Sequence, residues 1–186
     1  MNSKLVLEAV KFATEAHKDQ FRKWQSGPKG PEPYIRHPIR VEMEVRKYTD
    51  DDEVLAAAIL HDVVEDCNVE LSDVAHLFGI NVSILVWELT NPSKQFPKLK
   101  RNERKKIDRD HIAKASADAQ IIKACDRIDN LKSMKDAPFD FVSLYLHESL
   151  LLSDVLTKIP ESLLSELSQT IKSIGVKYER KTSSKA

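Results

Sequence analysis

The chain has 186 residues, 41% of them hydrophobic and 31% charged, which is typical of one globular domain and not of a disordered segment. Lys plus Arg and Asp plus Glu number 29 each, so the net charge gives no reason to expect nucleic-acid or membrane binding. The two cysteines, Cys67 and Cys125, are too few and too far apart for a disulfide framework, and reduced thiols are typical of a cytoplasmic protein. No apolar run approaches the roughly 18 residues of a membrane span, and the first residues lack the apolar stretch of a signal peptide.

Helical spacing of apolar residues dominates the N-terminal half, and alternating strand patterns are nearly absent. An apolar stripe predicts a helix over residues 3–20. The stretch 25–33 holds two Gly and three Pro and is predicted to be a loop. Residues 38–48 are predicted to be helical, with Pro38 in the first turn. Asp50 to Asp52 offer N-caps for a helix that continues to about residue 66.

The C-terminal half continues the helical pattern. Residues 71–78 are predicted to form a short helix that Gly79 ends, and residues 82–89 form the next one. A loop over 91–100 precedes a highly charged helix over 101–115. Ser116 caps a helix over 117–134, and Pro138 and Pro160 precede two last helices. Residues 1–176 are therefore predicted to be one all-α domain of about eight to ten helices, and the polar residues 177–186 a flexible tail.

The segment 54–66 carries the strongest chemical pattern. Seven apolar residues lead directly into His61 and Asp62, and Glu65 and Asp66 follow after two valines. Buried carboxylates are costly unless they are paired or bound to a metal. On a continuous helix of about 100° per residue, the four polar side chains spread over roughly 140° and face one cleft. The alternative is an amphipathic helix whose exposed last turn happens to be acidic, although acidic groups conflict there with the helix dipole.

Two further segments add polar residues to apolar surroundings. His37 stands before Pro38 at a predicted helix start, where a capping or packing role is the ordinary reading. Lys123, Asp126 and Asn130 are spaced i, i+3 and i+7, which places them on one helix face. Alone, that face would be read as a polar stripe, solvated or salt-bridged, on a partly buried helix.

Together, the segments form an ordered set of landmarks. These are residues 16–23 (AHKDQFRK), 33–38 (PYIRHP), 57–66 (AAILHDVVED), 78–79 (FG), 89–90 (LT) and 123–131 (KACDRIDNL). The set resembles the HD phosphohydrolase superfamily. It is most similar to the hydrolase domain of RelA/SpoT-type alarmone enzymes and to the small alarmone hydrolases, which include the metazoan SpoT homologue. The resemblance runs from about residue 9 to residue 156 and implies an HD-type helical bundle.

The resemblance implies a metal centre and a catalytic pair. One Mn²⁺ ion is expected on His37, His61, Asp62 and Asp126, although the ligand types also suit Fe or Zn. Glu65 and Asp66 match the pair that the family requires for hydrolysis. A metal-bound water has a lowered pKa, and either carboxylate can orient it and accept its proton.

The resemblance also implies a nucleotide site. Arg22 and Lys23 match positions that line the substrate phosphate site, although they would otherwise be ordinary surface charges. Asn130 matches a position that shapes the pocket, and Tyr145 lies near one that contacts the nucleotide. Stacking on a base is expected for Tyr34. The six residues predicted to bind substrate are Arg22, Lys23, Tyr34, Lys123, Asn130 and Tyr145.

The expected reaction is removal of the 3′-pyrophosphate from ppGpp or pppGpp, which gives GDP or GTP. The partner is thus a small nucleotide, with neither nucleic acid nor membrane, and the sequence leaves a homo-oligomer open. Departures from the family, such as Cys67 in place of Thr and the divergent stretch 91–100, leave the exact substrate open. The alternatives are another nucleotide such as NADPH, and a regulator that binds an alarmone without turnover.

Overall fold

The structure, a computed structural model, describes residues 3–27 and 30–183. Helices dominate, and the one sheet found in these residues is the antiparallel hairpin β1–β2. The first half comprises α1 (Lys4–Ala16), β1 (Phe21–Gly27), β2 (Gly30–Pro33), α2 (Arg36–Val45), α3 (Asp52–Leu60), α4 (Val63–Asp66), α5 (Leu71–Phe78) and α6 (Ile80–Leu89). The second half comprises the 3₁₀ helix η1 (Pro92–Gln95), α7 (Arg101–Ile112), α8 (Ala117–Lys132), α9 (Phe139–Ser153) and α10 (Glu161–Ser183).

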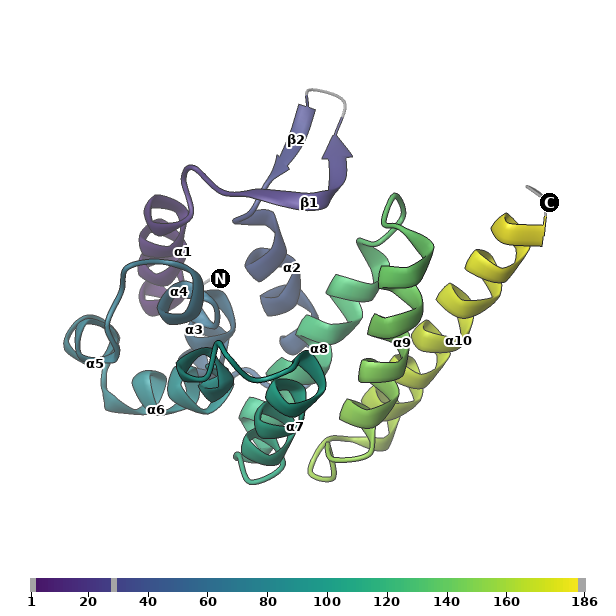
Figure 1. Ribbon diagram of the computed structural model, residues 1–186. Helices are drawn as coiled ribbons and strands as arrows, with labels where there is room; N and C mark the ends of the chain where they lie inside the picture. The colour runs from purple at the N-terminus through teal and green to yellow at the C-terminus, as the bar shows by residue number, and fades with distance from the viewer. Residues whose placement is uncertain (1–2, 28–29, 184–186) are drawn as a thin grey trace.

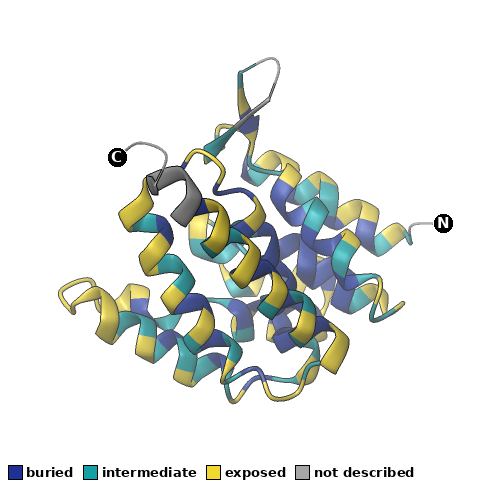
Figure 2. Cartoon of the chain, turned by 90° about the vertical axis from the view of Figure 1, so that its right-hand side faces the viewer, coloured by how far each residue is buried: buried dark blue, intermediate teal, exposed yellow. Residues whose placement is uncertain are grey.

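Helices α3 and α8 form the centre of the bundle. Every residue of α3 from Val54 to Leu60 is buried, because α1, α2 and α6 pack around it. Helix α8 joins the two halves of the molecule: it contacts α2 and α6 on one side and α9 and α10 on the other (Figure 1). Figure 2 shows the buried residues concentrated on the inward faces of the helices. The predicted all-α, single-domain bundle is confirmed.

Several predicted helix ends are confirmed by their capping contacts, whereas the first helix ends at Ala16 and not at residue 20. The Ser3 hydroxyl accepts a hydrogen bond from the backbone N–H of Val6 at 3.3 Å, and Ser116 caps α8 through the N–H of Ala119 at 3.2 Å. Gly79 ends α5 with φ at 94°, a conformation that side chains with a Cβ rarely adopt.

The predicted loop over residues 25–33 is wrong, because the chain forms the hairpin there. Phe21 pairs with Pro33 and Gly27 with Gly30, and the register shifts between Phe21 and Ser26. Strand β1 has the sequence FRKWQSG, which lacks the alternation of apolar and polar residues that marks a half-buried strand. The hairpin stands at the edge of the bundle above α2, so it needs no such alternation (Figure 1).

The predicted continuous helix to residue 66 is also wrong. Helix α3 ends at Leu60, α4 begins at Val63, and His61 and Asp62 form the turn between them. The His61 ring contributes to this break, since its Nδ1 donates a hydrogen bond of 2.8 Å to the carbonyl of Ala58 in the last turn of α3. A side chain that donates to a carbonyl at a helix end competes with the backbone N–H group that would otherwise extend the helix.

Helix α10 continues beyond residue 176, the predicted end of the domain, to Ser183. Residues 184–186 lie outside the described part of the chain, so the division into domain and tail stays a prediction. Within the described residues, no helix combines the length and the apolar character needed to cross a membrane.

Candidate metal centre

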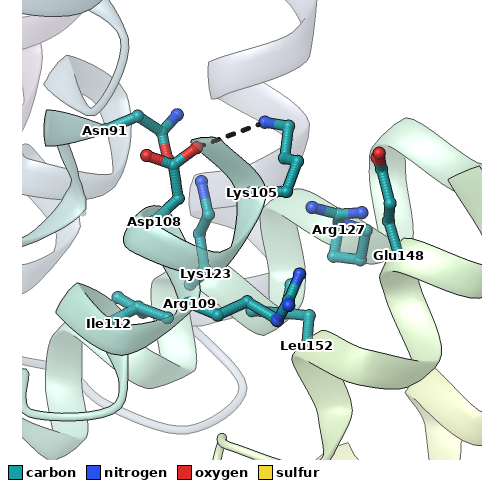
Figure 3. A pocket seen from close by; sticks show the side chains of 9 residues that line it. All are labelled: Asn91, Lys105, Asp108, Arg109, Ile112, Lys123, Arg127, Glu148 and Leu152. Atoms are coloured by element: carbon teal, nitrogen blue, oxygen red, sulfur yellow. Dashed lines mark hydrogen bonds and ion pairs between the residues drawn. The ribbon is translucent and has the colours of Figure 1, made fainter. Parts of the chain in front are cut away.

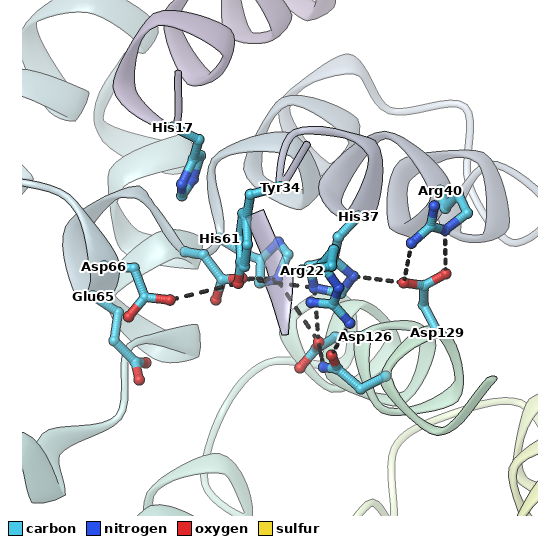
Figure 4. A network of polar contacts seen from close by, with 12 residues as sticks. His17, Arg22, Tyr34, His37, Arg40, His61, Glu65, Asp66, Asp126 and Asp129 are labelled. Atoms are coloured by element: carbon cyan, nitrogen blue, oxygen red, sulfur yellow. Dashed lines mark hydrogen bonds and ion pairs between the residues drawn. The ribbon is translucent and has the colours of Figure 1, made fainter. Parts of the chain in front are cut away.

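Three separate segments bring metal-ligand side chains to one place. His37 comes from the first turn of α2, His61 from the turn after α3, and Asp126 from the middle of α8. One ligand atom from each lies within 4.8 Å of the others, and all three residues are buried. Figure 4 shows the side chains converging on a common point. The packing of α8 against α2 and α3 therefore assembles the cluster.

Asp62, predicted as a fourth ligand, adjoins this cluster. Its Oδ2 lies 3.0 Å from Nε2 of His61 and 3.6 Å from Nε2 of His37. The same oxygen accepts a hydrogen bond of 2.6 Å from the Tyr34 hydroxyl. Asp126 Oδ1 lies 3.3 Å from Nε2 of His37. The structure thus brings all four predicted ligands together, and their binding of an ion stays a prediction.

The two imidazoles are held in the orientation that a metal requires. Nδ1 of His37 donates to Asp129 Oδ2 at 2.7 Å, and Nδ1 of His61 donates to the carbonyl of Ala58. Within the described part of the chain, the buried Nε2 atoms of both rings make no hydrogen bond, although carboxylate oxygens of Asp62 and Asp126 lie 3.0 and 3.3 Å from them. A ring fixed through Nδ1 presents its Nε2 lone pair, which is the arrangement found in metal-binding histidines. These unpartnered nitrogens beside two carboxylates fit a divalent cation.

The electrostatics of the cluster favour added positive charge. Burial alone would lower the pKa of His61, but the neighbouring carboxylates of Asp62 and Asp126 raise it to about 9. Burial opposes ionisation of Asp126, yet Lys123 and both imidazoles hold its pKa well below the usual range. The carboxylates of Asp62 and Asp126 thus surround both Nε2 atoms with negative charge, and a bound cation would offset that charge.

The predicted catalytic pair, Glu65 and Asp66, forms the last two residues of helix α4, next to the cluster. Both Glu65 oxygens accept hydrogen bonds from Asn91, whose backbone N–H is at 3.1 Å and whose Nδ2 is at 2.7 and 3.0 Å. Asp66 pairs with Lys94 at 2.8 Å. The Tyr34 hydroxyl lies 2.6 Å from Asp62 and 3.5 Å from Asp66, which links the pair to the metal ligands.

Five of the six predicted substrate residues line one cavity of about 250 Å³ between the hairpin, α8 and α9. Arg22 lies in its wall and donates to Asn130 Oδ1 at 2.7 Å and to Ser133 Oγ at 2.8 Å. Trp24 and Phe141 add aromatic surface, with ring centroids 5.9 Å apart. The five are Arg22, Lys23, Tyr34, Asn130 and Tyr145.

Lys123 does not line that cavity. Its ammonium group pairs with Asp126 Oδ2 at 3.2 Å and lines a different pocket, beside α7. The predicted position on the face of Asp126 and Asn130 is correct, and substrate binding by Lys123 stays a prediction.

Sequence reasoning missed the residues that hold the site in place. Asp129 anchors His37, and Arg40 in turn binds Asp129 through Nε at 2.6 Å (Figure 4). Asn91 and Lys94, which hold the acidic pair, fall in a stretch that was interpreted only as a loop. Their one signal in the sequence is a group of polar residues directly after a buried helix.

Comparison with known proteins agrees with this geometry. A family model described as HD domain matches residues 9–150. Over 131 residues, 69% of each chain, the sequence is 37% identical to guanosine-3′,5′-bis(diphosphate) 3′-pyrophosphohydrolase MESH1 of Drosophila melanogaster. It is 39% identical, over 131 residues and 69% of each chain, to the Homo sapiens protein of the same name.

A solved structure supports the same relation. It is described as a metazoan ortholog of SpoT that hydrolyzes ppGpp and plays a role in starvation responses. It superposes with a TM-score of 0.81 at 31% identity, and the match covers 94% of this chain and 98% of the other. Both the sequence and the fold therefore place this chain in the HD domain family, among relatives named as ppGpp hydrolases.

Proposed function

We propose that this chain is a metal-dependent hydrolase that removes the 3′-pyrophosphate from the guanosine alarmones ppGpp and pppGpp. The observation that carries the proposal is the pair of unpartnered Nε2 atoms of His37 and His61, which meet Asp126 beside the carboxylates of Glu65 and Asp66. The relatives named as ppGpp 3′-pyrophosphohydrolases support the choice of substrate.

His37, His61, Asp62 and Asp126 would hold the ion, and Mn²⁺ is our choice among the cations that accept imidazole and carboxylate. A bound divalent cation lowers the pKa of water and polarises a phosphoryl oxygen. Asp129 contributes by keeping the His37 ring in place, and Tyr34 does the same for Asp62.

The reaction transfers the terminal pyrophosphoryl group to water. The water oxygen bonds to the phosphorus on the 3′ oxygen, the bond between that phosphorus and the 3′ oxygen breaks, and the 3′ oxygen takes up a proton. Glu65 or Asp66 accepts the proton that the water loses, a role that contributes about 10²–10⁴-fold to a rate. Asn91 and Lys94 hold the two carboxylates in position for it.

The aromatic cavity suits the nucleoside. A base can stack on its aromatic walls, and the exposed Lys23 and the Arg22 guanidinium supply positive charge for phosphate. Cytoplasmic placement agrees with the free thiols of Cys67 and Cys125 and is part of the proposal.

The test is a panel of nucleotides incubated with the Mn²⁺-loaded protein, with the products identified. Release of pyrophosphate from ppGpp and pppGpp is the expected result. Turnover of NADPH or another nucleotide, with none of ppGpp or pppGpp, would reject the two alarmones as substrates. The assignment as a hydrolase would still hold.

A double variant separates a hydrolase from a regulator that only binds alarmones. Glu65→Ala with Asp66→Ala is expected to lose turnover by at least about 100-fold while it still binds ppGpp. Glu161→Ala, an exposed acidic residue at the start of α10, is the control and should retain both properties. Undiminished turnover in the double variant would remove the acidic pair from the mechanism.

A further inference from the structure

A second pocket lies between α7, α8 and α9, and the mechanism above makes no use of it (Figure 3). Its volume is about 40 Å³. A single water needs about 10–15 Å³ by the same measure, so the pocket has room for about three waters. That space suits one tetrahedral phosphate group and is too small for a nucleobase.

Positive charge dominates the lining of this pocket. Lys105, Arg109, Lys123 and Arg127 contribute four cations, and Figure 3 shows Lys105, Lys123 and Arg127 around one space. The lining also contains two carboxylates, and each is engaged elsewhere. Glu148 binds Arg101 through both oxygens, at 2.7 and 3.0 Å.

The other carboxylate is Asp108. It accepts hydrogen bonds from the backbone N–H of Ser93 at 3.2 Å and from its hydroxyl at 3.0 Å. Lys105 approaches it only to 3.5 Å. The pocket therefore keeps an excess of positive charge.

Arg127 is the residue that most needs an anion. It is only 8% exposed, and no carboxylate of the described residues lies within ion-pairing distance of it. One NH group donates to Ser149 at 3.1 Å, the guanidinium lies 4.3 Å from the centre of the Tyr145 ring, and the buried Nε has no partner within the described chain. A buried cation without a counter-charge is strongly unfavourable unless a ligand supplies that charge.

Two neighbouring cations have partners, since Lys123 pairs with Asp126 at 3.2 Å and Lys105 with Asp108 at 3.5 Å, but these pairs leave Lys105 beside the unpaired Arg127. Burial lowers the pKa of Lys105 and the positive charges of Arg127 and Lys123 lower it further, so that the pairing with Asp108 does not compensate. A bound phosphate would relieve this repulsion and would accept hydrogen bonds from the same groups.

The pocket also adjoins the reaction centre. Lys123 lines it and lies 3.2 Å from Asp126, a predicted metal ligand. Asn91 lines it as well and holds Glu65. Arg127 lies over Tyr145, which belongs to the wall of the aromatic cavity. A nucleotide in the aromatic cavity with its 3′ phosphorus at the metal centre can thus extend its terminal phosphate toward Arg127.

We propose that Lys105, Lys123 and Arg127 form a subsite for the terminal phosphate of the leaving pyrophosphate. The subsite makes the enzyme select a pyrophosphoryl group over a single phosphoryl group, and it rests on the hydrolytic function proposed above. The chemical class that it recognises is a diphosphate attached to the 3′ position, held at one end by the metal centre and at the other by the cations.

The first test is calorimetric titration of the full chain with inorganic pyrophosphate, in metal-loaded and metal-stripped form. Arg127→Met is expected to weaken pyrophosphate binding about 10- to 100-fold, the effect of losing a charge-assisted hydrogen bond. Lys105→Gln, which alters a less buried side chain, should also weaken pyrophosphate binding. Lys106→Gln removes an exposed cation of the same helix that pairs with Asp110, and should bind as the wild type does.

Two results of this titration would overturn the subsite. One is wild-type binding of pyrophosphate by both Arg127→Met and Lys105→Gln, and the other is no measurable binding by the wild type. Circular dichroism checks that each variant is folded, and Lys105→Gln keeps the test decisive should Arg127→Met fail to fold.

The second test separates the subsite from the function. With ppGpp, Arg127→Met should raise KM by at least about 10-fold, while its affinity for GDP, which lacks the 3′ group, stays unchanged. An equal loss of GDP affinity would show that the pocket holds the 5′ phosphates, which overturns the proposal. Arg127-dependent pyrophosphate binding in a protein that does not hydrolyse ppGpp would support the anion subsite and reject the proposed function.

Discussion

His37 depends on a residue that is not itself a ligand. Asp129 accepts the hydrogen bond from its Nδ1, and Arg40 binds both Asp129 oxygens at 2.6 and 3.2 Å. Burial works against ionisation of Asp129, but these two donors hold its pKa below the usual range. The negative charge of Asp129 therefore fixes the tautomer of His37 and raises the basicity of the ring nitrogen that faces the metal centre.

Replacing Asp129 by Asn is expected to lower metal affinity by about 10–100-fold without removing any ligand, because an outer partner of a ligating imidazole typically has this effect. A titration with Mn²⁺ measures the affinity directly. Asp136→Asn, an exposed residue outside the site, is the matched control. Unchanged affinity in Asp129→Asn would show that the ring is held by packing alone.

At the scale of single residues, sequence reasoning found the groups that carry their own motif. His61 and Asp62 follow a long apolar run, and Asp126 shares a helix face with Lys123 and Asn130. Asp129 and Arg40 have no comparable signal, because a partly buried ion pair between residues 89 positions apart is visible only once α2 and α8 are known to pack together.

Among the elements, the turn between α3 and α4 is where local sequence reasoning failed. An apolar run followed by polar residues has the same pattern whether the helix continues or breaks. The contact between the His61 ring and the Ala58 carbonyl, which accompanies the break, involves a side-chain orientation that periodicity does not describe. The hairpin was missed for a related reason, since its edge position removes the need for alternating residues.

Gly79, between α5 and α6, provides a test of backbone conformation. An added Cβ would meet no atom within 4 Å, so Gly79→Ala should destabilise only through its φ of 94°, by about 1–3 kcal/mol. Urea unfolding measures the change. Gly175→Ala, inside α10, is the matched control. Its Cβ would make an ordinary contact of 3.9 Å with Leu146 of α9, and the change should stabilise by about 0.5–1 kcal/mol. Equal effects at both positions would contradict this explanation.

For the whole molecule, the helical pattern was enough to predict the class of fold, and the order of most helices followed from Gly, Pro and capping residues. The pattern does not say which helices touch. The meeting of residues 37, 61 and 126 was inferred from resemblance to a family, and the structure supplies the physical reason, which is the packing of α8 across α2 and α3.

Metal should stabilise the entire fold, because its ligands come from three segments that the unfolded chain does not hold together. At a free metal concentration 100 times Kd, the expected gain is about 2.7 kcal/mol. Thermal unfolding with Mn²⁺ and with a chelator measures it as a difference in Tm. Asp126→Ala should lose the tightly bound ion and most of this difference. Full metal occupancy in that variant would remove Asp126 from the ligand set.

Helix α3, which ends directly before His61, has no residue at the surface between Val54 and Leu60. A change of volume at any of these positions moves the neighbouring helices and displaces an imidazole along with them. Substitutions in this interior are therefore expected to impair activity as well as folding. Changes that alter the choice of nucleotide are instead expected in exposed connections such as residues 95–100, which lie outside the ion site.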